Sequence, residues 1–198
     1  GLHALPVAGR HARELALVRR ALPAESLAWD EAGKPRLAND GSGVSFSHDD
    51  GVLLAFSARG VAGCDALPLS DRKKADWAEL LPKPVRPLLE RFPDPDAGGH
   101  YLWAGLEALR KAAGLALDDF EFEGLRDDAA RFASDGVVAL VFPVRLSRGA
   151  PRILAFAFPS PEARKEAAGP APLRAEAELR GPAAAEVGAP NGLFVVRK

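Results

Sequence analysis

The chain has 198 residues, of which 47% are hydrophobic, enough to bury an ordinary core in one large domain or two smaller lobes. Its 26 Lys and Arg residues are balanced by 27 Asp and Glu residues, which excludes the overall positive field typical of nucleic-acid-binding proteins. The single cysteine, Cys64, excludes an internal disulfide framework, and no apolar run approaches the roughly 20 residues that cross a membrane. We therefore expect a globular cytoplasmic protein without nucleic-acid or membrane partners. Because the chain contains no methionine, even at position 1, we also expect it to be either a piece of a longer polypeptide or a processed chain.

The first half of the chain predicts one helix followed by strands. Residues 9–22 have apolar positions at helical spacing and arginines on the remaining faces. Glycine and proline forbid a continuous helix over 30–43. The runs 44–48 and 52–58 flank an Asp-Asp-Gly turn and predict a β-hairpin, and 61–67 predicts a third strand.

The second half repeats this order. Proline, glycine and aspartate concentrate in 82–99, which predicts a connection between two lobes. A helix over 100–113 should follow, because its leucines are spaced four and three residues apart and a glycine comes directly after it. The runs 137–146 and 152–158 then predict a second pair of strands around a glycine-containing turn.

The two halves therefore predict an α/β (α+β) fold, built as a pseudo-twofold pair of similar lobes, each with a helix packed on a small antiparallel sheet. Residues 1–95 form the expected N-terminal lobe and residues 96–198 the expected C-terminal lobe. From about residue 160 the C-terminal lobe should have a less regular tail, although 173–179 alternates apolar and charged residues as an exposed strand does.

Two strand ends carry polar residues suited to anion or metal chemistry. Ser47 and His48 end one strand and could hydrogen-bond a phosphate, although polar residues at a strand end also simply enter a turn. Asp65 ends a Gly-x-Asp run after an apolar strand, where it is either a turn-forming residue or a metal ligand.

The helix over 100–113 carries the third polar group. Trp103, Glu107 and Lys111 are spaced four residues apart and share one helix face. The ordinary explanation of a Glu and a Lys at this spacing is a surface salt bridge, so the helix alone decides nothing.

Taken together and in order, these segments resemble the signature of the 4'-phosphopantetheinyl transferases. The resemblance covers roughly residues 9–158 and rests on four motifs, which are Gly33-Lys34-Pro35, Ser47-His48, Gly63-Cys64-Asp65 and the helix that bears Trp103, Glu107 and Lys111. More narrowly, the chain is similar to transferase domains fused to iterative polyketide synthases, including those that make enediynes, through Ala62-Gly63-Cys64-Asp65, Arg72 and Trp77-Ala78-Glu79-Leu80-Leu81.

The resemblance implies a Mg²⁺-dependent reaction that moves the phosphopantetheine arm of coenzyme A onto a serine of an acyl or peptidyl carrier protein, with release of 3',5'-ADP. The carrier could be a domain of the same polyketide synthase. The pyrophosphate of coenzyme A repels an attacking serine oxygen, so a divalent cation held by carboxylates is needed to neutralise it. The resemblance implies that Asp65 and Glu107 hold this cation, that Glu107 also serves as the base for the carrier serine, and that Lys111 contacts the phosphates.

The resemblance also implies a site for coenzyme A, which is the substrate. Its phosphates would bind Ser47 and His48, and its 3'-phosphate and adenine would lie near Lys34 and Pro35. An arginine of the first helix, Arg10 or Arg13, would complete this part of the site.

The chain departs from the family pattern at two positions. Leu67 stands where many relatives have a second acid, and Leu106 stands where many have a lysine before the helix glutamate. These departures leave three hypotheses: an active transferase, a catalytically silent module that binds the carrier protein or coenzyme A, and an unrelated two-lobed protein.

Other conspicuous residues favour structural roles. We expect Cys64 to be a small core residue, and the acidic run 118–123 to be a solvated edge strand because it alternates with phenylalanine. Trp29 and Trp77 are expected in the core or between the lobes.

Overall fold

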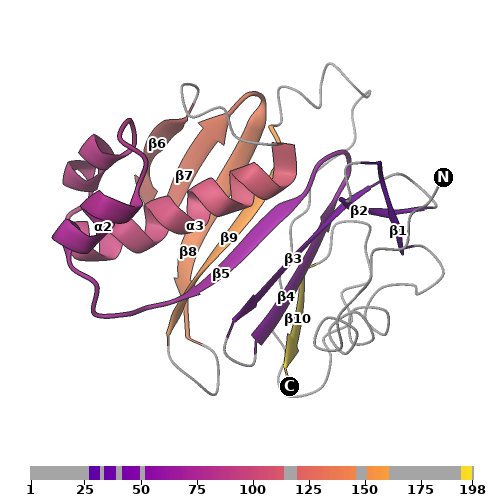
Figure 1. The fold of residues 1–198 in the computed structure, drawn as a ribbon, viewed down its shortest axis with the longest axis horizontal. Helices are drawn as coiled ribbons and strands as arrows, with labels where there is room; N and C mark the ends of the chain where they lie inside the picture. The colour runs from indigo at the N-terminus through magenta and orange to yellow at the C-terminus, as the bar shows by residue number, and fades with distance from the viewer. Residues whose placement is uncertain are drawn as a thin grey trace.

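The computed structural model describes residues 27–31, 34–38, 42–49, 52–113, 120–145, 151–160 and 193–197, and these ranges form two antiparallel sheets and several helices (Figure 1). The first sheet has the strand order β1-β2-β3-β4-β10, with bounds β1 (Leu27–Trp29), β2 (Pro35–Leu37), β3 (Gly43–Asp49), β4 (Val52–Ala58) and β10 (Leu193–Arg197). The second has the order β5-β9-β8-β7-β6, with bounds β5 (Gly63–Pro68), β6 (Glu121–Arg126), β7 (Ala129–Ser134), β8 (Val137–Val144) and β9 (Arg152–Pro159).

The helices lie beside the second sheet (Figure 1). They are α2 (Lys74–Leu80), the 3₁₀ helix η2 (Arg86–Arg91) and the long helix α3 (Pro95–Ala113). The apolar face of α3 packs on β5, β8 and β9, and the resulting core includes the fully buried Trp77, Leu102, Leu109, Phe132 and Ile153. The predicted core position of Trp77 is therefore confirmed, whereas Trp29 on β1 is half-buried.

A second, smaller core joins the two sheets. It contains Leu54 from β4, Cys64 and Ala66 from β5, and Leu154 and Phe156 from β9. One face of β5 thus packs on α3 while the other packs on β4, and the prediction that Cys64 is a small core residue is confirmed.

Most of the predicted elements within the described residues are confirmed. The hairpin of 44–48 and 52–58 corresponds to β3 and β4, the third strand to β5, and the runs 137–146 and 152–158 to β8 and β9. The acidic run continues as the edge strand β6, whose Phe122 is buried between exposed glutamates. The predicted helix over 9–22 and the strand over 173–179 lie outside the described residues.

The predicted start of the long helix was wrong, because α3 begins at Pro95 and not near residue 100. The Asp94 side chain accepts a hydrogen bond from the backbone N–H of Asp96, as a helix-capping residue does, and proline is well suited to the first helical position. Gly98 and Gly99, which indicated a connection in the sequence, are instead sites of close packing: a Cβ would lie 2.6 Å from Phe92 at Gly98 and 2.0 Å from Trp77 at Gly99.

The described elements form an α+β fold in which each sheet contains strands from both sides of the expected boundary near residue 95. β5 comes before the expected boundary near residue 95 but pairs with β9 in the second sheet, and β10 comes after that boundary but pairs with β4 in the first. The division into lobes at residue 95 stays a prediction.

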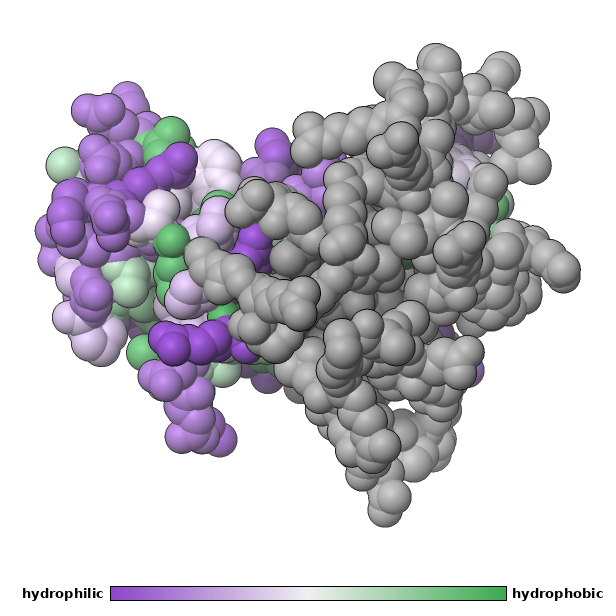
Figure 2. Space-filling view, turned by 90° about the horizontal axis from the view of Figure 1, so that it is seen from below, coloured by the Kyte–Doolittle hydropathy of each residue, from purple (hydrophilic) through white to green (hydrophobic). Residues whose placement is uncertain are grey.

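The surface around α2 is mainly hydrophilic, with apolar groups scattered among charged ones (Figure 2). Among the described residues the large exposed hydrophobic side chains are Leu80 and Leu125. None of the described helices is long and apolar enough to span a membrane.

Candidate functional site

The close contact between β5 and α3 depends on Gly63, which has no side chain. A Cβ at this position would lie 1.9 Å from the carbonyl oxygen of Ala108 and 2.8 Å from the backbone nitrogen of Ala112. Because side chains alternate along a strand, Asp65 lies on the same face of β5 as Gly63, toward α3. The glycine therefore allows the helix to approach the strand closely enough for a lysine of α3 to reach Asp65.

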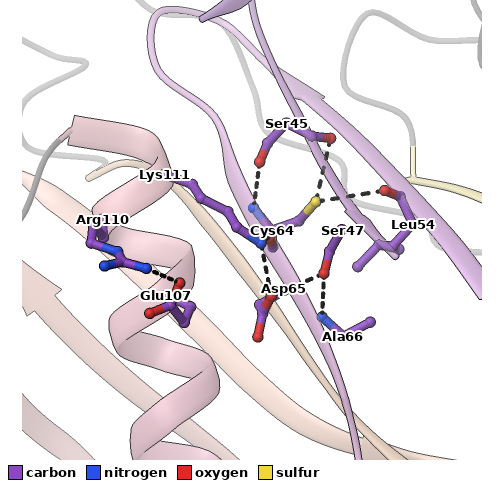
Figure 3. Close-up of polar contacts among 9 residues, drawn as sticks. All are labelled: Ser45, Ser47, Leu54, Cys64, Asp65, Ala66, Glu107, Arg110 and Lys111. Carbon is purple, nitrogen blue, oxygen red and sulfur yellow. Dashed lines mark hydrogen bonds and ion pairs between the residues drawn. The ribbon is translucent and has the colours of Figure 1, made fainter. Parts of the chain in front are cut away.

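The ion pair between Lys111 and Asp65 is the central contact of the candidate site (Figure 3). Lys111 Nζ lies 2.8 Å from Asp65 Oδ1 and also donates a hydrogen bond of 2.9 Å to the backbone carbonyl of Cys64. The side chains are 31% and 12% exposed, so solvent screens the pair only in part. The structure thus brings together two predicted site residues from segments far apart in the sequence.

Ser47 and His48 are neighbours on β3 but lie on opposite faces of that strand. The Ser47 hydroxyl is buried, donates a hydrogen bond of 2.9 Å to Asp65 Oδ1 and accepts one of 3.1 Å from the backbone N–H of Ala66 (Figure 3). The His48 side chain is exposed. Ser47 therefore joins the Asp65 cluster, and the phosphate-binding roles expected for Ser47 and His48 stay predictions.

Glu107 lies on α3 one turn before Lys111. Its side chain is 19% exposed, and its Oε2 lies 2.5 Å from a guanidinium nitrogen of Arg110 (Figure 3). The surface salt bridge that the spacing of Glu107 and Lys111 allows is not formed, because Lys111 pairs with Asp65 instead. The ordinary explanation of this Glu and Lys is therefore wrong.

Two carboxylate oxygens at the site accept no hydrogen bond from the described residues: Oδ2 of Asp65 and Oε1 of Glu107. Carboxylate oxygens are the ligands that Mg²⁺ prefers, and Mg²⁺ completes its shell with water and phosphate oxygens. No group of three or more His, Cys, Asp or Glu side chains that could hold a metal ion occurs in the described ranges. The described residues thus provide two carboxylates of the type that Mg²⁺ prefers, and each of them is ion-paired with a cation of α3.

A cavity of about 340 Å³ lies beside Lys111 and is also lined by Lys34, Pro35 and Arg36. Lys34 Nζ is 3.4 Å from the backbone carbonyl of Ala112, and this contact holds the lysine against the end of α3. The cavity therefore brings three predicted site residues, Lys34, Pro35 and Lys111, to one place and gives a nearly neutral protein a local cationic surface.

The other residues singled out from the sequence are not part of the cluster around Asp65 and Lys111. Arg10 and Arg13 lie outside the described residues. Leu67 is half-buried and Leu106 is buried, and both pack in the core between α3 and the second sheet. Because Leu67 lies on the same face of β5 as Asp65, an acid there would have been directed toward this helix.

Reasoning from the sequence missed two residues of the site, Arg36 and Arg110, and also Ser45, which accepts a hydrogen bond from the backbone N–H of Cys64. Arg36 lines the cavity and its guanidinium pairs with Asp30. Ser45 has the same strand parity as Ser47, and this alternation was the signal that could have identified it. Arg110 follows Glu107 by three residues on the helix, which is a spacing for an ion pair.

Neither the models of protein families nor the curated proteins contain a match to this chain.

Proposed function

We propose that the chain is a Mg²⁺-dependent 4'-phosphopantetheinyl transferase that modifies a serine of an acyl or peptidyl carrier protein. The observation that carries the proposal is the contact of 2.8 Å between Asp65 on β5 and Lys111 on α3, with Glu107 one helical turn away. A metal-binding carboxylate beside a phosphate-binding ammonium is the arrangement that transfer from a pyrophosphate requires.

The proposal gives each side chain a chemical role. Bound Mg²⁺ supplies charge neutralisation on the pyrophosphate, and Asp65 and Glu107 would hold it through the carboxylate oxygens that the described residues leave unbonded. Lys111 has three N–H donors, two of which serve Asp65 and Cys64, so one remains for a phosphate oxygen. Glu107 is the carboxylate that would accept the proton of the carrier serine.

The cavity beside Lys111 would hold the nucleotide end of coenzyme A. Lys34 and Arg36 line it and provide the cationic groups that a 3'-phosphate needs. The proposal includes the pseudo-twofold pair of lobes and the cytoplasmic location expected from the sequence. It also includes a carrier domain of a polyketide synthase as partner, which the family resemblance implies.

The proposal is tested by incubating the chain with coenzyme A, Mg²⁺ and a set of carrier proteins, and by measuring the mass of each carrier. We expect one carrier to gain the mass of phosphopantetheine. Asp65→Ala and Glu107→Gln should each abolish this gain because each removes a metal ligand. Glu121→Gln, which makes the same chemical change on the exposed edge strand β6, should not. Transfer at an unchanged rate in either site variant would refute the mechanism.

A silent binding module is the second candidate, and one observation favours it. Both acids of the site already have a cationic partner, since Asp65 pairs with Lys111 and Glu107 with Arg110. Titration calorimetry with coenzyme A separates the candidates: binding without any transfer supports the module, and neither binding nor transfer removes both.

A further inference from the structure

Two serine hydroxyls accept hydrogen bonds from the backbone N–H groups on the edge of β5 that faces away from β9. β5 pairs with β9 along one edge, and on the other edge the backbone N–H groups of Cys64 and Ala66 point toward β3. Ser45 Oγ accepts the first at 3.0 Å and Ser47 Oγ accepts the second at 3.1 Å. Both serines are buried, with 5% and 6% of their surface exposed. Each hydroxyl therefore takes the place of the backbone carbonyl that a neighbouring strand would offer to this N–H group.

The two serines differ in what else they contact. Ser47 also donates to Asp65 Oδ1 at 2.9 Å, whereas Ser45 contacts no carboxylate among the described residues. A hydroxyl carries one hydrogen, so the donation to Asp65 uses the full donor capacity of Ser47. A phosphate oxygen needs a donor, and Ser47 has none to offer while this bond exists.

We propose that Ser47 is a positioning residue that orients the Asp65 carboxylate for a divalent cation and that it does not bind phosphate. This inference rests on the proposed function, because it assigns a metal to Asp65. Ser47 and Lys111 both donate to Oδ1 and restrict rotation of the carboxylate, which leaves Oδ2 as the oxygen presented to the cation.

The test compares Ser47→Ala with Ser45→Ala, its matched control. Both variants remove a buried hydroxyl of β3 that accepts a hydrogen bond from the backbone of β5, but only Ser47→Ala also removes a donor to Asp65. Binding of Mn²⁺, which prefers oxygen ligands as Mg²⁺ does, is followed by loss of the free-ion signal in electron paramagnetic resonance. Binding of coenzyme A without metal is followed by calorimetry.

We expect Ser47→Ala to raise the Kd for Mn²⁺ about tenfold and to leave the Kd for coenzyme A unchanged. Ser45→Ala should change the Kd for Mn²⁺ by less than about twofold, although both variants should lose similar stability in urea. Ser47→Thr keeps the hydroxyl and should retain tight Mn²⁺ binding. If Ser47→Ala does not fold, Ser47→Cys replaces the hydroxyl by a weaker donor of similar size and should weaken Mn²⁺ binding in the same direction.

Three results would overturn the inference. An unchanged Kd for Mn²⁺ with a raised Kd for coenzyme A would make Ser47 a phosphate ligand and leave the transferase proposal intact. Equal weakening of Mn²⁺ binding in both alanine variants would show a general effect of the β5 edge. Wild-type protein that binds no Mn²⁺ and transfers nothing would remove the transferase proposal and the inference with it.

Discussion

Replacing Gly63 by alanine should separate α3 from β5 and destabilise the protein. The new Cβ would lie 1.9 Å from the Ala108 carbonyl oxygen, whereas real Cβ contacts stay above 3.0 Å, and the obstacle is backbone, which cannot rotate away. Helix and strand must therefore move apart by roughly 1 Å, in a region where overpacking costs about 1–3 kcal/mol. A separation of that size would also lengthen the 2.8 Å ion pair between Lys111 and Asp65. We expect the free energy of unfolding to fall by about 3 kcal/mol, at the upper end of that range.

Urea unfolding followed by tryptophan fluorescence measures this loss, since the buried Trp77 becomes exposed when α3 detaches. Gly105→Ala on the same helix is the matched control. Its Cβ would lie 2.8 Å from the ring of Phe132, a side chain that can shift, and alanine favours the helix by about 1 kcal/mol over glycine. Gly105→Ala should therefore cost less than half as much. A loss below about 1 kcal/mol for Gly63→Ala would refute the idea that this contact sets the helix position.

Two further predictions concern buried titratable groups. Burial lowers the pKa of His100, whose Nε2 accepts a hydrogen bond from the backbone N–H of Ser70. The unfolded state therefore binds the proton more readily than the folded state. As a result, the free energy of unfolding should fall as the pH drops below about 6.5. Urea unfolding at about pH 7.5 and pH 5 measures this loss; it should be smaller in His100→Gln, and an equal loss in both proteins would contradict the assignment. Burial also raises the pKa of the Cys64 thiol from 9.0 to about 12, so alkylation by iodoacetamide at about pH 8 should be roughly a thousandfold slower in folded than in urea-unfolded protein. Similar rates in both states would show that the thiol is accessible.

The strands β3, β4, β5, β8 and β9 could be predicted from the sequence because each is a short apolar run, whereas β1, β2 and β7 were not predicted. The pairing between them could not, since β5 is hydrogen-bonded to β9, about 90 positions further along the chain. The start of α3 was misplaced because two adjacent glycines indicate a connection, and only tertiary packing on Trp77 and Phe92 explains them inside a helix.

Only part of the candidate site could be predicted, because residue spacing within a helix is a local property and contacts between helix and strand are not. Helical spacing placed Glu107 and Lys111 on one face, and that local rule holds within α3. It could not show that Lys111 forms an ion pair with Asp65 and not with Glu107, or that Glu107 pairs with Arg110. Those partners depend on how closely the strand approaches the helix, which a glycine determines through contacts that are distant in sequence.

The pairing of β4 with β10 has a consequence for synthesis of the chain. Phe56 pairs with Leu193 and Val52 with Arg197, so the partners are roughly 140 positions apart. On the ribosome, β4 emerges long before the strand that will cover its edge has been translated, and its apolar run Val-Leu-Leu-Ala-Phe stays available to other chains during that interval. Nascent chains should therefore depend on chaperones until residues 193–197 leave the exit tunnel, and refolding of the first sheet should be slow.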